Sequence, residues 1–350
     1  MIRIQSATLI PGTYFCFVDD KFVIRELFLD EGQGLERARL DFPSLYSTVF
    51  VEDTLGRINP LNIRPYSPQS VTVFSGPYIL ISQSFDDRNL YHWLFLALQK
   101  VWMVENEMDL QQYKLLITYE PSSMQLELLN IFFPHLIKYF VVYSPSKEEA
   151  QIRGVERVAI QIPELISGFF LPSDFRYLTF LRNRLSQYAH QQQIERQPNS
   201  SEFVYVTRGD GGNRNRELYN RDEIEEVFTK HGFAVVRMSE LPIKSQISVT
   251  RGARIFAFEH GAAGSWITAL RPNSIVLELI SPLNSPTSRE IATHYRSLTA
   301  NFQDLTYYQI LGAIEQVSLT SEVKFTISPQ VLNEIIPDLK LMIKRSKDDR

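Results

Sequence analysis

Short apolar runs alternate with helical patterns between residues 202 and 281, and the connections between them are only a few residues long. Runs of this length that are apolar throughout are typical of strands buried on both faces of a parallel sheet. The alternation therefore predicts a doubly wound α/β domain at roughly residues 200–320. Asn220 and Glu223 are expected to form a capping-box pair, and Gly232 to end that helix. Strands are expected at 202–208, 233–238, 254–259 and 275–280, and helices at 220–231, 241–253 and 265–270.

The first half of the chain is less regular. Residues 1–70 predict short strands and loops, and the alternation resumes at Val71. A polar, proline-containing stretch at 194–202 is typical of a linker. We therefore predict an N-terminal α/β domain at 1–195, a C-terminal one at 196–320, and a charged helix or tail at 321–350. The strands of the first domain are expected at 71–82, 113–120 and 137–144, and its helices at 87–106, 122–133 and 175–192.

Composition excludes several classes of protein. The formal net charge of −4 gives no electrostatic reason to expect a nucleic-acid partner. One cysteine, Cys16, excludes an internal disulfide and a multi-thiolate metal site. No apolar run approaches the roughly 18 residues of a membrane helix, and Pro11-Gly12 breaks the apolar N-terminus. We expect a cytoplasmic protein whose contact with membranes is at most peripheral, through its charged C-terminal tail.

A histidine and two glycines lie where a predicted strand passes into a helix. His260 follows the strand directly, and Gly261 and Gly264 let a ligand approach the main chain. The helix that follows directs its free N–H groups and its positive dipole end into the same space. The loop from His260 through Ala262 to Ser265 therefore suits a phosphate group, although a tight turn with a surface histidine has the same pattern.

A second loop, at residues 209–216, is rich in glycine and arginine and also follows a strand of the predicted sheet. Arg208, Arg214 and Arg216 lie in or beside it. One guanidinium group can donate two parallel hydrogen bonds to two oxygens of the same phosphate. Alone, this segment could be a solvated loop. Two anion-suited loops at one edge of a sheet favour a binding function. Arg214 occupies the third glycine position of G-x-G-x-x-G, so dinucleotide binding is not indicated.

A third stretch, from residue 84 to 101, predicts a helix with one histidine off its core face. Asp86 or Asp87 is expected to cap this helix. His92 lies in its first turn, nearly opposite the apolar stripe, so it can meet a ligand, although a lone histidine on a helix is usually structural. The stripe is formed by Leu90, Leu94, Ala97, Leu98 and Val101.

The three stretches together resemble glycosyltransferase family 61. The order and spacing of the matching segments agree from about residue 86 to 281. Three positions bear on loop geometry and donor preference: Glu259 replaces the usual proline, Asn273 replaces a glycine, and Ala263 is either an extra residue or a replacement of the second glycine. The matching segments are Asn89 with His92 and Trp93, the strand end 205–208, the helix start 220–223, the loop 260–264 and the segment 271–279.

The resemblance implies the GT-B architecture, in which two Rossmann-like doubly wound domains face each other across a cleft. It also implies inverting transfer from a nucleotide-sugar donor to an oligosaccharide or lipid-linked glycan acceptor, and bacterial relatives often lie in capsule or lipopolysaccharide loci. The sequence has no Asp-x-Asp, the motif that holds a divalent metal in many sugar transferases. We therefore expect no metal and no cofactor, since the nucleotide sugar is a substrate.

Such a transfer needs a base for the acceptor hydroxyl and positive groups for the departing phosphate. One of the three arginines and the loop at 260–265 are expected to bind the donor phosphates. His92 is the candidate base, with Asp86 and Asp87 next, and Glu278, at a strand end, is expected to bind the ribose. Two alternatives stay open: a pyruvyl or other group transferase on the same fold, and a non-catalytic nucleotide- or sugar-binding protein.

Overall fold

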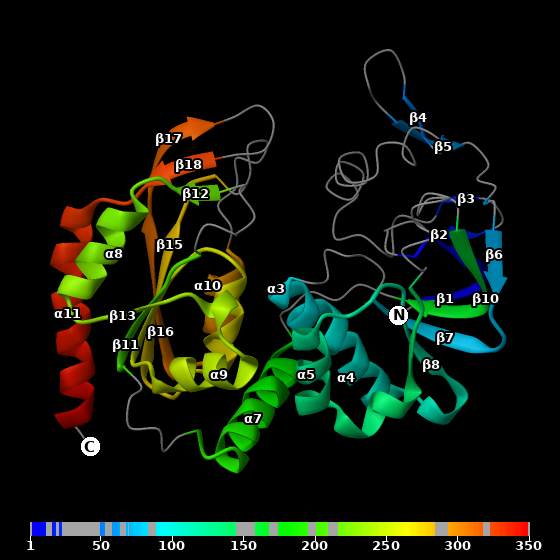
Figure 1. Ribbon diagram of the computed structural model, residues 1–350, viewed down its shortest axis with the longest axis horizontal. Coiled ribbons are helices and arrows are strands. Elements are labelled where there is room, and N and C mark those ends of the chain that lie inside the picture. The colour runs from blue at the N-terminus through cyan, green and yellow to red at the C-terminus, as the bar shows by residue number, and fades with distance from the viewer. Residues whose placement is uncertain are drawn as a thin grey trace. The chain divides into compact units, whose positions relative to one another are not determined.

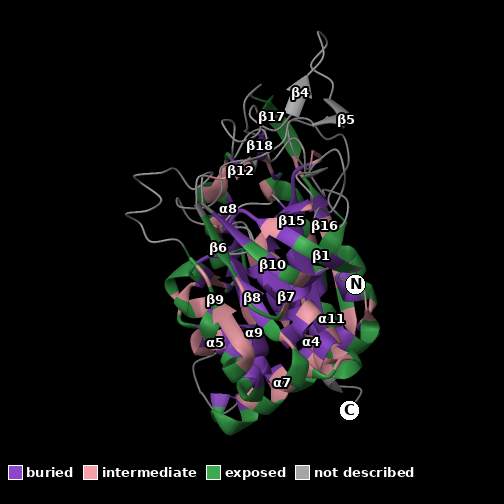
Figure 2. Ribbon diagram, turned by 90° about the vertical axis from the view of Figure 1, so that its right-hand side faces the viewer, coloured by how far each residue is buried: buried purple, intermediate pink, exposed green. Residues whose placement is uncertain are grey.

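The computed structural model in Figure 1 divides into two compact units, Met1–Pro172 and Ser173–Arg350. The described residues are 2–11, 16–18, 21–22, 50–52, 58–63, 68, 70–82, 89–144, 158–167, 174–194, 201–208, 216–283, 293–317 and 323–348. Each unit contains a sheet with parallel strands, so the expected α/β class is confirmed. Figure 2 shows that buried residues concentrate on the strands, among them β7 (Pro77–Ser82) and β15 (Ser274–Ile280).

The second unit contains a five-stranded sheet in which every neighbouring pair is parallel. In order along the sheet its strands are β13, β11, β14, β15 and β16, so the chain begins inside the sheet, adds one strand on one side and then three on the other. The direction of winding therefore reverses between β11 and β14. The strands other than β15 are β11 (Phe203–Val206), β13 (Ala234–Val236), β14 (Ile255–Glu259) and β16 (Leu305–Leu311).

Helices cover both faces of this sheet, as the doubly wound prediction requires. Helices α8 and α11 pack together on one face, while α7, α9, α10 and the 3-10 helix η8 pack on the other (Figure 1). The predicted helix at 265–270 is this 3-10 helix. The bounds are α7 (Phe175–Gln191), α8 (Arg221–Lys230), η7 (Met238–Glu240), α9 (Ile243–Gly252), η8 (Ala262–Ala269), α10 (His294–Ala300) and α11 (Pro329–Asp348).

The core beneath α8 and α11 joins the C-terminal helix to the sheet. Tyr205 of β11 stacks on Phe228 of α8, with ring centroids 4.1 Å apart. Ile336 and Leu339 of α11 are buried in the same cluster. Helices α7 and α11 both belong to the second unit.

A small three-stranded sheet adjoins the start of α8, with strand order β12, β18, β17. Asn220 is the N-cap residue of α8 and its amide nitrogen donates to the Glu223 carboxylate at 3.1 Å, but its side chain accepts no main-chain N–H of that helix. Its amide nitrogen also donates to the carbonyl of Ile327 at 2.8 Å, and its amide oxygen instead accepts from the Ile327 N–H at 3.1 Å. The predicted Asn220–Glu223 pair is therefore present, whereas the main-chain half of the cap is replaced because the parallel β12–β18 pair brings the main chain of Ile327 beside Asn220. The bounds are β12 (Arg216–Leu218), β17 (Ala313–Val317) and β18 (Val323–Thr326).

The first unit contains a mixed sheet with strand order β3, β2, β1, β10, β7, β8, β9. Strands β7, β8, β9 and β10 are parallel, whereas β1, β2 and β3 run antiparallel to their neighbours. Strands β6 and β7 both pair with β10, and Gly76, with φ of 92°, lies in the break between them. The bounds are β1 (Ile2–Leu9), β2 (Cys16–Val18), β3 (Lys21–Phe22), β6 (Ser70–Val73), β8 (Lys114–Ile117), β9 (Phe140–Val142) and β10 (Val158–Ser167), with β4 (Phe50–Glu52) and β5 (Ile58–Ile63) paired separately.

The predicted helix around residue 92 exists, but it begins later and is interrupted. Its N-cap is Asn89, whose side chain accepts from the Tyr91 N–H, so the expected cap at Asp86 or Asp87 was wrong. The helix changes to π geometry at Trp93–Ala97, and all five of these residues are buried. The bounds are α3 (Leu90–His92), η2 (Trp93–Ala97), α4 (Leu98–Glu107), η3 (Leu110–Gln112), α5 (Ser123–Phe132) and η4 (Pro134–Tyr139).

Candidate active site

The residues that directly follow two of the predicted strands lie at one edge of the second sheet. The segment from Thr207 follows β11, and the segment from His260 follows β14. These strands are parallel neighbours, so their carboxyl ends lie side by side. They are also the pair at which the winding reverses. In open α/β sheets ligands bind beyond the carboxyl ends at such a switch point, so the topology locates the candidate site here.

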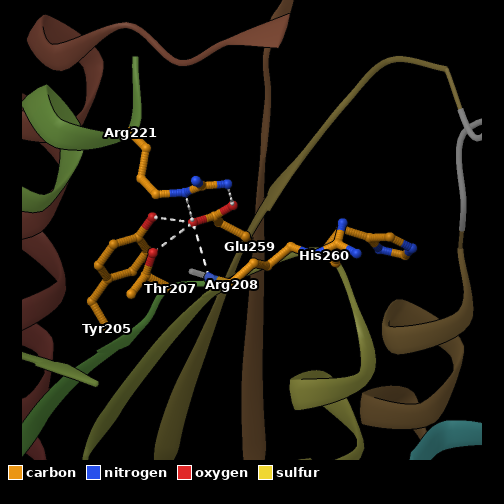
Figure 3. Close-up of polar contacts among 6 residues, drawn as sticks. All are labelled: Tyr205, Thr207, Arg208, Arg221, Glu259 and His260. Carbon is orange, nitrogen blue, oxygen red and sulfur yellow. Dashed lines mark hydrogen bonds and ion pairs between the residues drawn. The ribbon is translucent and has the colours of Figure 1, made fainter. Parts of the chain in front are cut away.

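The carboxylate of Glu259, the last residue of β14, organises this edge (Figure 3). The residue is 2% exposed. Its Oε1 accepts from the hydroxyls of Tyr205 at 3.3 Å and Thr207 at 3.0 Å, and from the main-chain N–H of Arg208 at 3.3 Å. Arg221, the first residue of α8, donates to both carboxylate oxygens, at 3.2 and 3.4 Å. Glu259 therefore ties together β11, α8 and β14.

The titration of the groups around Glu259 reflects their burial. Burial lowers the pKa of Arg208, with Glu259 acting in the opposite direction. Burial also lowers the pKa of Arg221, but the attraction of Glu259 outweighs it, so the net pKa is raised. Burial, reinforced by Glu259, raises the pKa of Tyr205 well above its usual value. Guanidinium groups stay charged in proteins, so the charge of Glu259 acts on two cations, of which Arg221 pairs with it directly.

The side chain of Arg208 reaches the opposite loop. Its Nη1 donates to the carbonyl of His260 at 3.4 Å. A Cβ on Gly261 would lie 3.4 Å from Nε of Arg208, so the guanidinium lies directly over this glycine. The structure thus brings together Arg208 and the His260 loop, which the sequence analysis assigned to one phosphate site.

His260 is held by a buried carboxylate. Its Nδ1 contacts Oε1 of Glu278, which is fully buried in β15, and His260 itself is 6% exposed. The other oxygen of Glu278 accepts from the hydroxyl of Tyr307 and from the amide of Gln309 at 3.4 Å. Burial and the neighbouring Glu278 raise the pKa of Tyr307, so its hydroxyl stays a donor. Both oxygens of Glu278 are thus bound to protein groups.

The remaining residues of the 260–265 loop divide by exposure. Ala262 begins η8 and, like Gly261, is partly exposed, so their main chain can meet a ligand. Gly264 and Ser265 are buried. The first turn closes where the Gly264 N–H donates to the Gly261 carbonyl at 3.0 Å, and the Tyr295 hydroxyl donates to the same carbonyl at 2.6 Å.

Several predicted site residues belong to other elements or lie outside the described residues. Arg214 and both aspartates, Asp86 and Asp87, are outside them. Arg216 begins β12, and the structure does not describe its side chain. His92 is the last residue of α3 in the first unit and is partly exposed.

A comparison with protein-family models matches residues 90–277, more than half of the chain, to the family described as Glycosyltransferase 61. The chain belongs to glycosyltransferase family 61. It is therefore an enzyme that transfers a sugar from a donor to an acceptor. The match includes His92, Arg208 and His260 and ends one residue before Glu278. A search of curated proteins found no match.

The sequence analysis of this glycosyltransferase missed several residues that build its site. Glu259 was noted only as a departure from the family pattern, although a carboxylate that closes an otherwise apolar strand is itself a signal of a buried polar partner. Arg221 was passed over as the first residue of a helix. Tyr307 and Tyr295 gave no local signal, because only strand pairing and helix packing bring them to Glu278 and Gly261.

Within the described ranges, no three or more His, Cys, Asp and Glu side chains gather as metal ligands would. In the same ranges, every helix is too short or too polar to cross a bilayer.

Gly264 tests the packing of this loop. A Cβ there would lie 2.6 Å from the ring of Tyr295 and 2.7 Å from the ring of Phe258. Neither ring can easily retreat, because both residues are buried and their rings contact each other edge to face. We expect Gly264→Ala to lower the free energy of unfolding by about 1–3 kcal/mol, measured by urea denaturation.

Gly261→Ala is the matched control, since its Cβ would meet only the Arg208 side chain at 3.4 Å. It should unfold within about 0.5 kcal/mol of the wild type. Equal destabilisation by the two variants would contradict the packing role assigned to Gly264.

Proposed function

We propose that this glycosyltransferase is an inverting, metal-independent enzyme of capsule or lipopolysaccharide biosynthesis that moves a sugar from a nucleotide-activated donor to a glycan acceptor. The observation that carries the proposal is the position of the Arg208 guanidinium over Gly261, at the switch point of a parallel sheet. A phosphate bound there would meet a cation and the start of η8 together.

The donor side of the reaction needs positive groups where the nucleotide phosphate leaves. Arg208 supplies one, and we assign the main chain of Gly261 and Ala262 as further donors because both residues are partly exposed. Arg214 and Arg216, which follow Arg208 in the sequence, are proposed to complete the phosphate site. An arginine can bind two oxygens of one phosphate at once without a metal ion. A metal-independent site also fits the lack of the Asp-x-Asp motif in the sequence.

His260 and Glu278 are proposed to act as one unit in this site. The Glu278 carboxylate fixes the orientation of the His260 ring through Nδ1. Since Tyr307 and Gln309 engage the other carboxylate oxygen, the geometry favours this orienting role for Glu278 over the predicted contact with ribose. His260 then holds its main-chain carbonyl, to which Arg208 donates, in a fixed position.

The acceptor side is proposed to use His92 as general base, with Asp86 and Asp87 as the alternatives. His92 is partly exposed and is the N-cap of the π-helical segment η2. Short π-helical turns occur often at functional sites, and imidazole titrates near neutral pH. We further propose the GT-B arrangement, with an oligosaccharide or lipid-linked glycan as acceptor, and a cytoplasmic location.

The first prediction of this proposal concerns Arg208. We expect Arg208→Ala to lose roughly 1.5–3 kcal/mol of affinity for the donor nucleotide, the range for hydrogen bonds to charged groups. Isothermal titration calorimetry with nucleoside diphosphates measures it. The matched control is Arg254→Ala, which removes an arginine at the start of β14, away from the carboxyl edge. Unchanged affinity in folded Arg208→Ala would refute the assignment.

The second prediction concerns metal. Incubation with a panel of nucleotide sugars and glycan acceptors should release nucleotide at the same rate with and without EDTA. The physical reason is that arginines and main-chain N–H groups stabilise the leaving phosphate. Activity that EDTA abolishes and Mn²⁺ or Mg²⁺ restores would overturn the metal-independent mechanism. Turnover with phosphoenolpyruvate instead of nucleotide sugars would establish a pyruvyl transferase.

The third prediction concerns His92. If its imidazole takes the acceptor proton, His92→Ala should lower kcat by about 10²–10⁴-fold. Donor affinity should stay near that of the wild type, because the phosphates are bound in the second unit. His190→Ala, which removes an exposed histidine of α7, is the control and should keep full activity. Normal kcat in His92→Ala, or a loss confined to donor binding, would move the base to Asp86 or Asp87.

A further inference from the structure

We infer that Glu259 is a positioning residue of the donor-phosphate site and that it acts through the main chain of Arg208. The inference rests on the proposed function, in which the Arg208 side chain binds the donor phosphate. Glu259 itself points away from that phosphate.

The first step is the direction in which the side chains point. Successive strand residues face opposite sides of a sheet. Tyr205, Thr207 and Glu259 face the α8 side, where they contact one another and Arg221 (Figure 3). Arg208 is the next residue along, and its side chain lies on the other side, over Gly261. A substitution of Glu259 therefore removes no direct contact with a ligand on the Gly261 side.

The second step is what Glu259 holds. Its Oε1 accepts from the main-chain N–H of Arg208 at 3.3 Å and from the hydroxyl of the preceding Thr207 at 3.0 Å. These bonds fix the chain where β11 ends and the glycine-arginine loop begins. The guanidinium of Arg208 reaches across from that fixed point to the carbonyl of His260. Loss of the carboxylate would let the starting point of the arginine side chain move.

The negative charge of Glu259 should affect phosphate binding in the direction opposite to its positioning effect. A carboxylate next to an anion site repels the anion, and Arg221 offsets this by its two bonds to Glu259. If charge dominated, neutralising Glu259 would tighten the binding of phosphates. If positioning dominates, the same change weakens it. The sign of the effect therefore separates the two roles.

The experiment is a titration of inorganic pyrophosphate into the full-length protein by calorimetry in the presence of EDTA. Glu259→Gln keeps the size of the side chain, removes its charge and replaces one of its two acceptor oxygens, both of which Arg221 engages, with an amide N–H₂. The remaining oxygen therefore cannot keep all the bonds to Arg221 and to the Arg208 N–H. We expect its dissociation constant for pyrophosphate to be about 10–100-fold higher than that of the wild type, the usual effect of losing a group that orients a ligand-binding residue. The matched control is Glu226→Gln, which neutralises an exposed glutamate of α8 and should bind like the wild type.

A second arm tests whether the effect passes through Arg208. In an Arg208→Ala background, Glu259→Gln should cause no further loss of pyrophosphate affinity, since the side chain that Glu259 positions is absent. If the two losses instead add in full, Glu259 acts by another route and the inference is wrong. A lowered melting temperature with unchanged affinity would also overturn it, because that is the result of a purely structural role.

The remaining outcomes are also decisive. Equal or tighter pyrophosphate binding by Glu259→Gln overturns the inference and leaves the proposed phosphate site standing. A wild-type protein that fails to bind pyrophosphate overturns both. If Glu259→Gln does not fold, Thr207→Val removes one donor to Oε1 at nearly constant volume. It should weaken binding in the same direction by a smaller factor, again only when Arg208 is present, and unchanged binding would refute the positioning role.

Discussion

The pairing of β11 with β14 is the constraint on which the site depends. About fifty residues separate these strands, yet Val206 lies in register with Phe258. The intervening chain makes this possible by adding β13 on the far side of β11 and returning through α9. Helices α8 and α9 consequently pack on opposite faces of the sheet. That geometry leaves an edge where two loops can meet.

One buried carboxylate with its own partners lies on each face of the sheet, near this carboxyl edge. Glu259 on the α8 side is bound by Arg221, and Glu278 on the other side is bound by His260. An ionised group without partners would cost several kcal/mol to bury. The donors come from β11, α8 and β16 as well as from the loops, so each carboxylate fixes the relative positions of several elements.

The sequence predicted the elements of the second unit well because their strands are apolar throughout and their connections are short. It also predicted that Arg208 and the His260 loop lie at one edge, since both follow strands of one parallel sheet. It could not predict the groups that hold them. Tyr307 reaches Glu278 only through the β15–β16 register, 29 residues away in the chain. Asn220 pairs with Glu223 as predicted, but its amide oxygen accepts from the main chain of Ile327, 107 residues away, because the β12–β18 pairing brings that segment beside it.

Glu259 shows why a departure from a family pattern can be more informative than agreement with it. A buried ion pair alone is weak evidence for stability, because the desolvation of two charges offsets much of their attraction. The Glu259 carboxylate does more than pair with Arg221, since the same oxygen satisfies a main-chain N–H and two hydroxyls. A proline, which the resemblance to the family pattern predicts at this position, has no side-chain acceptor for any of them. With proline there, Thr207, Arg208 and Arg221 would each need another partner, so the course of the chain after β11 would change. Glu259, one of the three positions at which the sequence differs from the family pattern it resembles, is therefore the one whose side chain binds the main chain at the end of β11.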